Sequence, residues 1–343
     1  MSAMTPPDGA ARLMLLDSAS LYFRAFFGVP DQRSDPSQPP TNAVRGFLDM
    51  IASLVTRFEP THLVACWDND WRPQWRVDLV PSYKAHRVAQ EAPPSLAAPA
   101  PAIPQLPDAP DQAHPASENT SPEEVPDDLA PQVPVIADAL AALGVVRLGA
   151  DGYEADDVIG TLTARARGTM PVDIVTGDRD LLQLVDDAHG VRVLFTGKGG
   201  VREPDVATQA YLRERYAVPT GEAYIDMSVL RGDTSDGLPG VKGIGDKTAA
   251  QLIAEHGSLT GLRAAVDSGD ATIKGARRAN LEAASDYLDV APTVVRVAKD
   301  APVPERDLRL PTGVADAALL SKVASEYGVT SSVNRVLTAL RIG

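Results

Sequence analysis

The sequence has little cysteine, few aromatic residues and no long apolar run. Its single cysteine, Cys66, lies in the apolar run 63–67, which predicts a small buried side chain on a strand and no disulfide. Aromatic residues make up 5% of the chain, so few surfaces can stack against bases. No run reaches membrane-spanning length, and residues 1–10 lack the basic and apolar regions of a secretory signal. Disulfide scaffolds and membrane proteins are excluded, and a cytoplasmic protein is expected.

Positive charge is also scarce, because 32 Lys and Arg stand against 46 Asp and Glu, for a formal net charge of −14. Such a balance argues against a nucleic-acid partner, since phosphate contacts need basic side chains. Two groups of acids account for much of the excess: nine candidate metal ligands, and eight acids in the stretch 91–134. The rest of the chain is nearly balanced, so a basic face for DNA remains open.

Apolar runs typical of strands alternate with stretches typical of helices, which predicts an α/β protein: a mostly parallel sheet with helices on both faces. The expected strands are 12–17, 61–67, 145–148, 172–176 and 191–195. The expected helices are 43–58, 133–143, 154–167 and 179–185. From 205 onward the chain is expected to be helical, except around 232–245.

Nine acidic residues fall in five clusters along this pattern: Asp17, then Asp68, then Glu154 with Asp156 and Asp157, then Asp178 with Asp180, then Asp233 with Asp236. Three of them follow strands, and sites in such sheets form beyond the carboxyl ends of strands. Gathered carboxylates need a cation, and Mg²⁺ takes oxygen ligands while keeping waters that a phosphate can replace. Two such ions about 3.5–4 Å apart make a phosphodiester-cleaving site. The clusters therefore favour a two-metal nuclease.

Each cluster also has a local structural explanation. The run 154–157 stands at a helix start, where acids favour the helix dipole. Asp178 can cap the short helix after it, and residues 233–236 can form an Asx turn. Such roles explain single clusters better than five together. Two other classes are disfavoured: Ala19 stands where a phosphatase would carry a second Asp, and residues 18–23 contain no glycine for a dinucleotide loop.

A basic and aromatic stretch directly follows Asp68 and contains Trp71, Arg72, Trp75, Arg76, Tyr83, Lys84, His86 and Arg87. One interpretation is a solvated helix face with buried aromatics. The other, favoured by the position next to Asp68, is a phosphate-binding edge with Lys84 and Arg87 on one helical face.

The stretch 91–134 holds 12 of the 29 prolines, and no Lys or Arg occurs between Arg87 and Arg147. This composition cannot bury much apolar surface, so a mobile, partly polyproline loop is expected. Expected strands lie on both sides of it, so it interrupts the α/β domain. Composition favours a tolerated surface insertion over a flexible lid.

Glycine is concentrated in the segment 237–245, which is the most distinctive of the chain and precedes an expected helix. Glycines let the backbone approach a phosphate closely, and a helix N-terminus favours an anion. An ordinary turn between helices is the alternative, but it rarely needs so many glycines. The segment predicts a backbone grip on DNA that does not depend on base sequence.

Five segments carry a family resemblance: LLDSASLYFRAF, WDNDWRPQWRVDLVPSYKAHR, GYEADDVIGTL, VTGDRDLLQLV and LRGDTSDGLPGVKGIGDKTA. In this order they resemble the bacterial 5′ nuclease family, which includes flap endonucleases and the 5′→3′ exonuclease domain of DNA polymerase I. The resemblance implies a PIN-like, mostly parallel twisted sheet flanked by helices at 1–204, with an arch at about 69–144 that contains the insertion 91–134. It also implies a mainly helical region at 205–343 with a helix–three-turn–helix DNA-binding element at 228–256.

The resemblance assigns roles to residues. All nine acids map onto the family's metal ligands, for two or more Mg²⁺ or Mn²⁺ ions. The catalytic arch and first-motif positions map onto Tyr83, Lys84, Arg87 and Arg24. The DNA-binding hairpin maps onto Gly240, Val241, Lys242, Gly243, Ile244, Gly245 and Lys247, and a K⁺ ion is implied there.

The implied function is a phosphodiester hydrolase that cleaves 5′ flaps and 5′ ends of DNA in replication primer processing and repair. The implied partners are DNA with a 5′ flap, nick or 5′ overhang, and RNA-primed ends, for a cytoplasmic monomer. No polymerase domain follows residue 343, so a standalone form is expected. The alternatives are a non-catalytic junction-binding protein with this fold, disfavoured by the intact acids, and a PIN-type ribonuclease, disfavoured by the glycine-rich segment.

Overall fold

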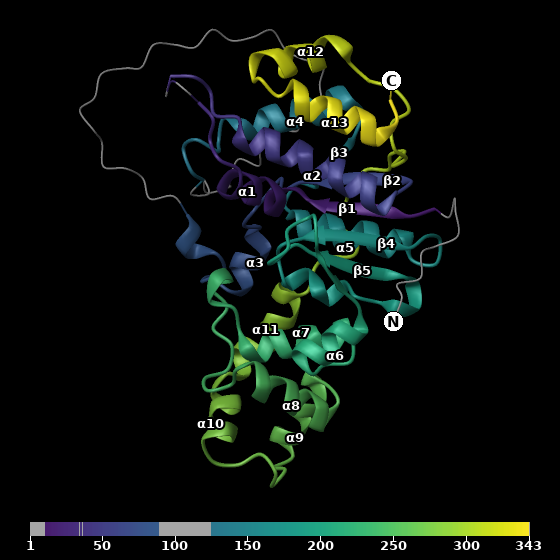
Figure 1. Cartoon of the computed structure of the whole chain (residues 1–343). Helices are drawn as coiled ribbons and strands as arrows, with labels where there is room; N and C mark the ends of the chain where they lie inside the picture. The colour runs from purple at the N-terminus through teal and green to yellow at the C-terminus, as the bar shows by residue number, and fades with distance from the viewer. Residues whose placement is uncertain (1–10, 34, 36, 89–124, 343) are drawn as a thin grey trace, which may run out of the picture.

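The computed structural model describes residues 11–33, 35, 37–88 and 125–342. The predicted insertion 91–134 lies outside the described residues as far as 124, and its last residues lead into a helix. Within the described ranges no helix is long and apolar enough to cross a membrane. A layered region of sheet and helices lies above a helical region in the view of Figure 1.

A six-stranded sheet forms the centre of the layered region. Its strands are β1 (Leu13–Asp17), β2 (His62–Cys66), β3 (Val146–Leu148), β4 (Val172–Thr176), β5 (Val191–Phe195) and β6 (Asp205–Ala207). They lie in the order β3-β2-β1-β4-β5-β6, with the first five parallel and β6 antiparallel to β5. The five strands expected from the sequence are confirmed to within one residue at each end, and so is the mostly parallel sheet.

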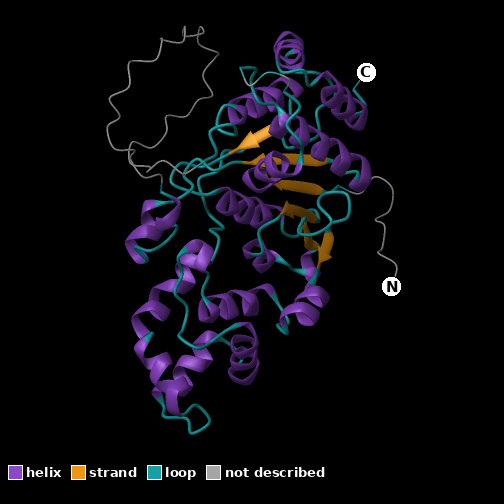
Figure 2. Cartoon of the chain, turned by 60° about the vertical axis from the view of Figure 1, so that its left-hand side comes forward, coloured by secondary structure: helices purple, strands orange, loops and turns teal. Residues whose placement is uncertain are grey.

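Helices cover both faces of the sheet, because its central strands are apolar on both sides (Figure 2). Met14 and Leu16 pack into one core with α1 (Ser18–Gly28), α2 (Asn42–Phe58) and α4 (Gln132–Leu143). Leu13 and Leu15 pack into the other with α5 (Ala155–Ala166) and the 3₁₀ helix η2 (Asp180–Leu184). The predicted helices in this region are confirmed, although 180–184 is 3₁₀ helix and α1 was not predicted.

The helical region follows β6. Its helices are α6 (Gln209–Tyr216), α7 (Gly221–Arg231), α8 (Asp246–His256), α9 (Leu259–Asp267), α10 (Gly275–Ala283) and α11 (Ser285–Val295). A short 3₁₀ helix, η4 (Thr234–Asp236), follows α7, whereas η3 (Asp187–His189) precedes β5 in the layered region. The α7–loop–α8 unit is the predicted pair of helices around a glycine-rich turn.

The structure departs from the expected partition of the chain at two places. Residues 205–207 are a strand of the sheet, although the helical region was expected to begin there. The helices α12 (Ala317–Glu326) and α13 (Thr330–Leu340) return to the layered region, where Val323 and Val336 pack into the core with α2 and α4 (Figure 1). The connecting segment lies beside β2, through the hydrogen bond from Leu63 N to Leu308 O of 2.9 Å. The apolar faces of α12 and α13 explain this return, because they are buried against α2 and α4.

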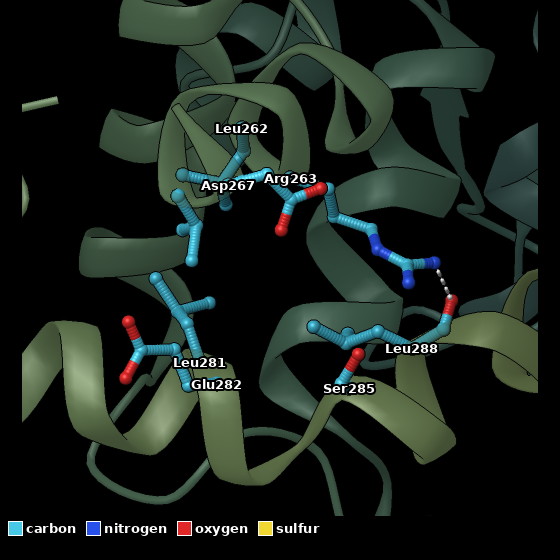
Figure 3. Close-up of a pocket in the computed structure, with 8 residues that line it drawn as sticks. Leu262, Arg263, Asp267, Leu281, Glu282, Ser285 and Leu288 are labelled. Atoms are coloured by element: carbon cyan, nitrogen blue, oxygen red, sulfur yellow. Dashed lines mark hydrogen bonds between the residues drawn. The ribbon is translucent and has the colours of Figure 1, made fainter. Parts of the chain in front are cut away.

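A small cavity of about 150 Å³ opens within the helical region. Leu262, Arg263 and Asp267 of α9 line one side of it, and Leu281 and Leu288 of α10 and α11 line the other (Figure 3). None of the nine acids lines it, so the candidate site must be sought at the sheet.

Candidate active site

The carboxyl edge of the sheet gathers the strand-end acids, as predicted. Asp17 is the last residue of β1, while Asp68 and Asp178 each follow their strand by two residues. Because β2 and β4 both pair with β1 in parallel, these three strand ends are neighbours. Asp17 is buried, and it accepts hydrogen bonds from Ser20 N at 3.1 Å and Thr176 Oγ1 at 2.6 Å.

The other acids near this edge are oriented by backbone groups. Asp68 accepts a hydrogen bond from Ala155 N at 2.8 Å, which places its carboxylate at the N-terminus of α5. Asp178 is exposed and accepts a hydrogen bond at 2.8 Å from the N–H of Asp180, the first residue of η2, although the N-cap position of that helix is Arg179. These donors are neutral and leave the charge of each carboxylate uncompensated.

Five of the nine acids make no ion pair with a Lys or Arg in the described part of the chain: Asp17, Asp68, Asp156, Asp178 and Asp180. Burial raises the pKa of Asp17 to about 7, and repulsion from Asp68 and Asp178 adds to the shift. Burial and repulsion from Asp17 and Asp178 raise the pKa of Asp156 well above its usual range. Burial and neighbouring carboxylates also raise the pKa of Asp180. The ionised forms of these acids are destabilised by their surroundings, and a bound cation would stabilise them.

Glu154 and Asp157 are compensated by residues of the basic stretch. Glu154 is buried, accepts a hydrogen bond from Tyr83 Oη at 2.7 Å and pairs with Lys84 Nζ. Arg76 Nη1 lies 3.1 Å from Glu154 Oε1, and the Arg76 guanidinium makes two bonds of 2.7 Å to the Asp157 carboxylate. Glu154 and Asp157 thus share one partner, Arg76 of the helix α3 (Gln74–Leu79).

Asp233 and Asp236 are compensated as well. Asp233 is buried, pairs with Arg179 and accepts from Ser235 N at 2.8 Å, which is the predicted Asx turn. Asp236 accepts from Arg87 Nη2 at 2.7 Å. The loop after α7 is therefore joined to the edge of the sheet and to the basic stretch by ion pairs.

Lys84 and Arg87 both reach the acids, but they do not share a helical face. Lys84 has φ of +48° and precedes the 3₁₀ helix η1 (Ala85–Arg87), because this segment is folded onto the loop after α7. Lys84 N donates to Asp236 O at 2.9 Å, and Ser82 Oγ donates to Gly237 O at 2.7 Å. A Cβ at Gly237 would lie 1.9 Å from Ser82 O, so only glycine permits this approach.

Arg24 lies on α1, where its Nη2 donates to Gly197 O at 2.7 Å, beyond the end of β5. The sequence reasoning placed Arg76 in the basic stretch without a role of its own, although it is buried and contacts two of the nine acids. Its only sequence signal was a single Arg between the aromatic residues Trp75 and Tyr83, whose rings it approaches to 4.3 Å and 5.8 Å from their centroids.

The glycine-rich turn presents some of its predicted residues and buries others. Lys242, Gly243, Gly245 and Lys247 are exposed, and Gly240 is partly exposed. Val241 and Ile244 are buried in the core of the helical region, so their side chains anchor the turn and only their backbone can face a ligand. Gly240 has φ of +62°, and a Cβ there would lie 2.5 Å from Arg231 O. The turn is thus held close to the end of α7.

The side chains at this edge are suitable metal ligands, but they are not close enough together to form a metal site as they stand. Among the described residues, no three His, Cys, Asp or Glu side chains form a group that could hold a metal ion as they stand. The donors are nevertheless carboxylates, which are the ligands of hard divalent cations. Burial, and to a smaller extent repulsion from neighbouring carboxylates, raises the pKa values of Asp17, Asp156 and Asp180. A cation would offset that repulsion.

Two family models match the chain almost end to end. The model described as "5'-3' exonuclease, N-terminal resolvase-like domain" matches residues 12–217, and "5'-3' exonuclease, C-terminal SAM fold" matches residues 219–316. The boundary between them lies in the connection between α6 and α7.

Curated relatives match over the same span. A 5'-3' exonuclease of Streptomyces coelicolor is 56% identical over 95% of this chain and 99% of its own length. A 5'-3' exonuclease of Mycobacterium tuberculosis is 47% identical over 96% of this chain and 97% of its own. DNA polymerase I of Mycobacterium bovis is 38% identical over 82% of this chain but only 27% of its own length.

Two solved structures of bacteriophage T5 proteins share the fold at low identity. The T5 5'-exonuclease with zinc bound has a TM-score of 0.59 at 18% identity and covers 96% of this chain and 98% of that one. The T5 flap endonuclease in a pseudo-enzyme-product complex with DNA and metal ions has a TM-score of 0.58 at 17% identity and covers 96% and 99%.

Proposed function

Since this chain belongs to the 5′-3′ exonuclease family, we propose that it is a metal-dependent, structure-specific 5′ nuclease that hydrolyses phosphodiesters in 5′ flaps and at 5′ ends of DNA. The observation that carries the proposal is the row of five uncompensated carboxylates at the carboxyl edge of the sheet, with Lys84 and Arg87 reaching the same edge. A cluster of carboxylates without cationic partners, close to Lys84 and Arg87, is suited to binding cations and phosphate together.

The residues that would hold divalent cations are first the five uncompensated acids, Asp17, Asp68, Asp156, Asp178 and Asp180. Glu154 and Asp236 lie next to them. Each forms an ion pair with a basic side chain, Lys84 or Arg87, which could bind a phosphate instead. Mg²⁺ or Mn²⁺ bound there, as two ions or more, would activate water and stabilise the charge that develops on the scissile phosphate. Asp17 is anchored by Ser20 and Thr176, so its carboxylate is aimed before any ligand binds.

Lys84 and Arg87 are suited to hold the scissile phosphate. The Lys84 ammonium is buried against Glu154, and Arg87 lies against Asp236 with its side chain partly exposed. A phosphate at the acid edge would replace these carboxylate partners with phosphate oxygens, which a guanidinium contacts through two N–H groups. Tyr83 Oη, which donates to Glu154, would keep that carboxylate in place when Lys84 turns to the phosphate. Arg24 would contact a phosphate next to the scissile one.

The helix–turn–helix formed by α7 and α8 would hold the duplex part of the substrate. Lys242 and Lys247 are exposed beside Gly243 and Gly245, so basic side chains and open backbone share one surface. A K⁺ ion at this turn is part of the proposal. The distance from this turn to the acids would then set the cleavage position.

The substrates proposed are DNA with a 5′ flap, a nick or a 5′ overhang, and RNA-primed ends. DNA binding is supported by the T5 flap endonuclease, whose structure contains DNA and metal ions. The roles proposed are replication primer processing and repair, in the cytoplasm of a bacterium like those of its relatives.

The proposal is tested by single-turnover cleavage of a 5′-labelled flap duplex in Mg²⁺, Mn²⁺ or EDTA. Wild type and a control, Asp300→Asn at an exposed position, are expected to release a short 5′ product in either metal and none in EDTA. Asp178→Asn is expected to lose cleavage while still binding the duplex. Duplex binding without cleavage by the wild type in both metals would contradict the proposal and favour a non-catalytic junction-binding protein.

A further inference from the structure

Two adjacent acids at the start of α5 have opposite surroundings. Asp156 faces the uncompensated carboxylates, since Asp17 and Asp178 are among the groups that repel it. Asp157, by contrast, is 0% exposed and lies against Arg76. Consecutive helical positions point about 100° apart, so one turn of helix presents one acid to the candidate metal site and buries the other.

Both oxygens of the Asp157 carboxylate are saturated by donors of the chain. Oδ1 accepts from Arg76 Nη2 at 2.7 Å and from Ala298 N at 2.7 Å. Oδ2 accepts from Arg76 Nη1 at 2.7 Å and from Glu154 N at 3.2 Å. Four donors occupy the four acceptor positions that a carboxylate offers. No acceptor position is left for a cation unless one of these bonds is broken.

Arg76 joins three segments that are far apart in the sequence. It lies on α3, is 3% exposed and stacks on Trp75. Its Nε donates to Val294 O at 3.1 Å, at the end of α11, and its Nη1 also contacts Glu154 Oε1. A cation that took Asp157 would leave this buried guanidinium without its bidentate partner, and such a lone buried charge is strongly destabilising.

We propose that Asp157 is not a metal ligand and that Asp157 and Arg76 form a buried ionic clamp that positions Glu154 and Asp156. The clamp fixes the first turn of α5 against α3 and the 294–298 segment, so that Asp156 is presented to the metal ions and Glu154 is held beside Lys84. Asp157 and Arg76 are thus positioning residues. This inference rests on the proposed function as far as the metal ions are concerned, whereas the clamp itself does not depend on them.

The test compares Asp156→Asn with Asp157→Asn in two measurements without DNA. The melting temperature of the metal-free protein is expected to fall by about 5 °C or more for Asp157→Asn. It is not expected to fall for Asp156→Asn. Calorimetric titration with Mn²⁺ is expected to show at least about tenfold weaker binding for Asp156→Asn. Asp157→Asn keeps one acceptor oxygen, which can accept from only one of the two backbone N–H groups, and it removes no proposed metal ligand, so its Mn²⁺ binding is expected to weaken less.

The deciding variant combines Arg76→Gln with Asp157→Asn, which replaces the buried ion pair by neutral amides. The pair is expected to recover metal-free stability relative to either single change and to bind Mn²⁺ within about threefold of wild type, because rescue by a partner is possible for a positioning acid. Arg76→Gln combined with Asp156→Asn is expected to show no such rescue. An Asp157→Asn protein that fails to fold beside a folded Asp156→Asn also supports the clamp.

The clamp is overturned if the paired variant binds Mn²⁺ as weakly as Asp156→Asn. It is also overturned if Asp157→Asn leaves the metal-free melting temperature unchanged. A wild type that binds no Mn²⁺ would count against the proposed function instead. In that case the stability coupling between Arg76 and Asp157 would still decide whether the clamp exists.

Discussion

The two ends of the central sheet treat buried aspartates in opposite ways. At the amino end, Asp173 of β4 is 0% exposed and is compensated by two arginines, with Arg12 Nη1 at 2.6 Å and Arg192 Nε at 2.7 Å. At the carboxyl end, Asp17 of the neighbouring strand β1 is also buried, but it is held by Ser20 and Thr176 and has no cationic partner among the described residues.

This difference separates stability from function within a single sheet. A buried carboxylate with two guanidinium partners has its charge offset in the folded chain, so it tolerates burial. A buried carboxylate without one has a raised pKa, which for Asp17 reaches about 7, and its charge opposes folding until a cation arrives. The charge at the amino end is therefore compensated within the chain, whereas the carboxyl end is the edge at which we propose that cations bind.

The largest expected effect comes from removing a charge at the carboxyl end. Asp17→Asn is expected to lower single-turnover cleavage of a flap duplex about 10³-fold, or ~4 kcal/mol in the barrier, because a candidate ligand is lost. The same change removes repulsion, so the metal-free protein should be no less stable to denaturant than wild type. Cleavage within tenfold of wild type, or clear destabilisation without metal, would contradict the comparison.

Removing the charge at the amino end should do the reverse. Asp173→Asn leaves Arg12 and Arg192 without their partner and is expected to lower the free energy of unfolding by about 2–3 kcal/mol, since both guanidinium groups keep some contact with solvent. Cleavage per folded molecule at a temperature well below unfolding should match wild type. An intact unfolding midpoint, or a specific loss of cleavage, would show that the two ends are not divided in this way.

A steric change can sharpen the comparison by displacing Lys84 while leaving the acidic side chains unchanged. Gly237→Ala is expected to slow cleavage about tenfold, because its Cβ would displace Ser82 and with it Lys84. The matched control is Gly328→Ala, which has a similar positive φ of +61° but nothing within 4 Å of the new Cβ. Duplex binding should be unchanged in both variants. Equal effects of the two changes on cleavage would assign the loss to backbone strain alone.

The smallest effect is expected at the exposed turn between α7 and α8. Lys242→Ala should weaken duplex binding a few-fold and reduce the slope of log affinity against log salt by about 1, because one phosphate contact is lost. Cleavage at saturating enzyme should hardly change, since Lys242 is proposed to contact the duplex and not the metal ions. An unchanged salt slope would remove this residue from the duplex contacts.

The sheet and the strand-end acids could be predicted because the information is local. Three of the buried strands are short apolar runs with an acid at the end or two residues beyond it, so Asp17, Asp68 and Asp178 are expected at the carboxyl edge of any parallel sheet built from these runs. The glycine-rich turn was found for the same reason, since several glycines between two helical patterns leave few alternatives.

The pairing of charges could not be predicted in this way. The rotation of α5 about its axis decides which acid of its first turn faces Arg76 and which faces the other acids. The contact between Arg76 and Asp157 joins residues 81 positions apart in the sequence. The left-handed conformation of Lys84 arises from its docking on the loop at Gly237, which periodicity does not reveal. The return of α12 and α13 to the layered region likewise depends on packing against α2 and α4, which are far from them in the sequence.

Anomalous diffraction from crystals grown with Mn²⁺ and a product duplex tests the central claim most directly, because it locates the ions. The account predicts Mn²⁺ peaks at the carboxyl edge, coordinated by members of the set Asp17, Asp68, Asp156, Asp178 and Asp180, with Asp157 still bonded to Arg76. Peaks away from that edge, or an edge without Mn²⁺ when the duplex is bound, would contradict it.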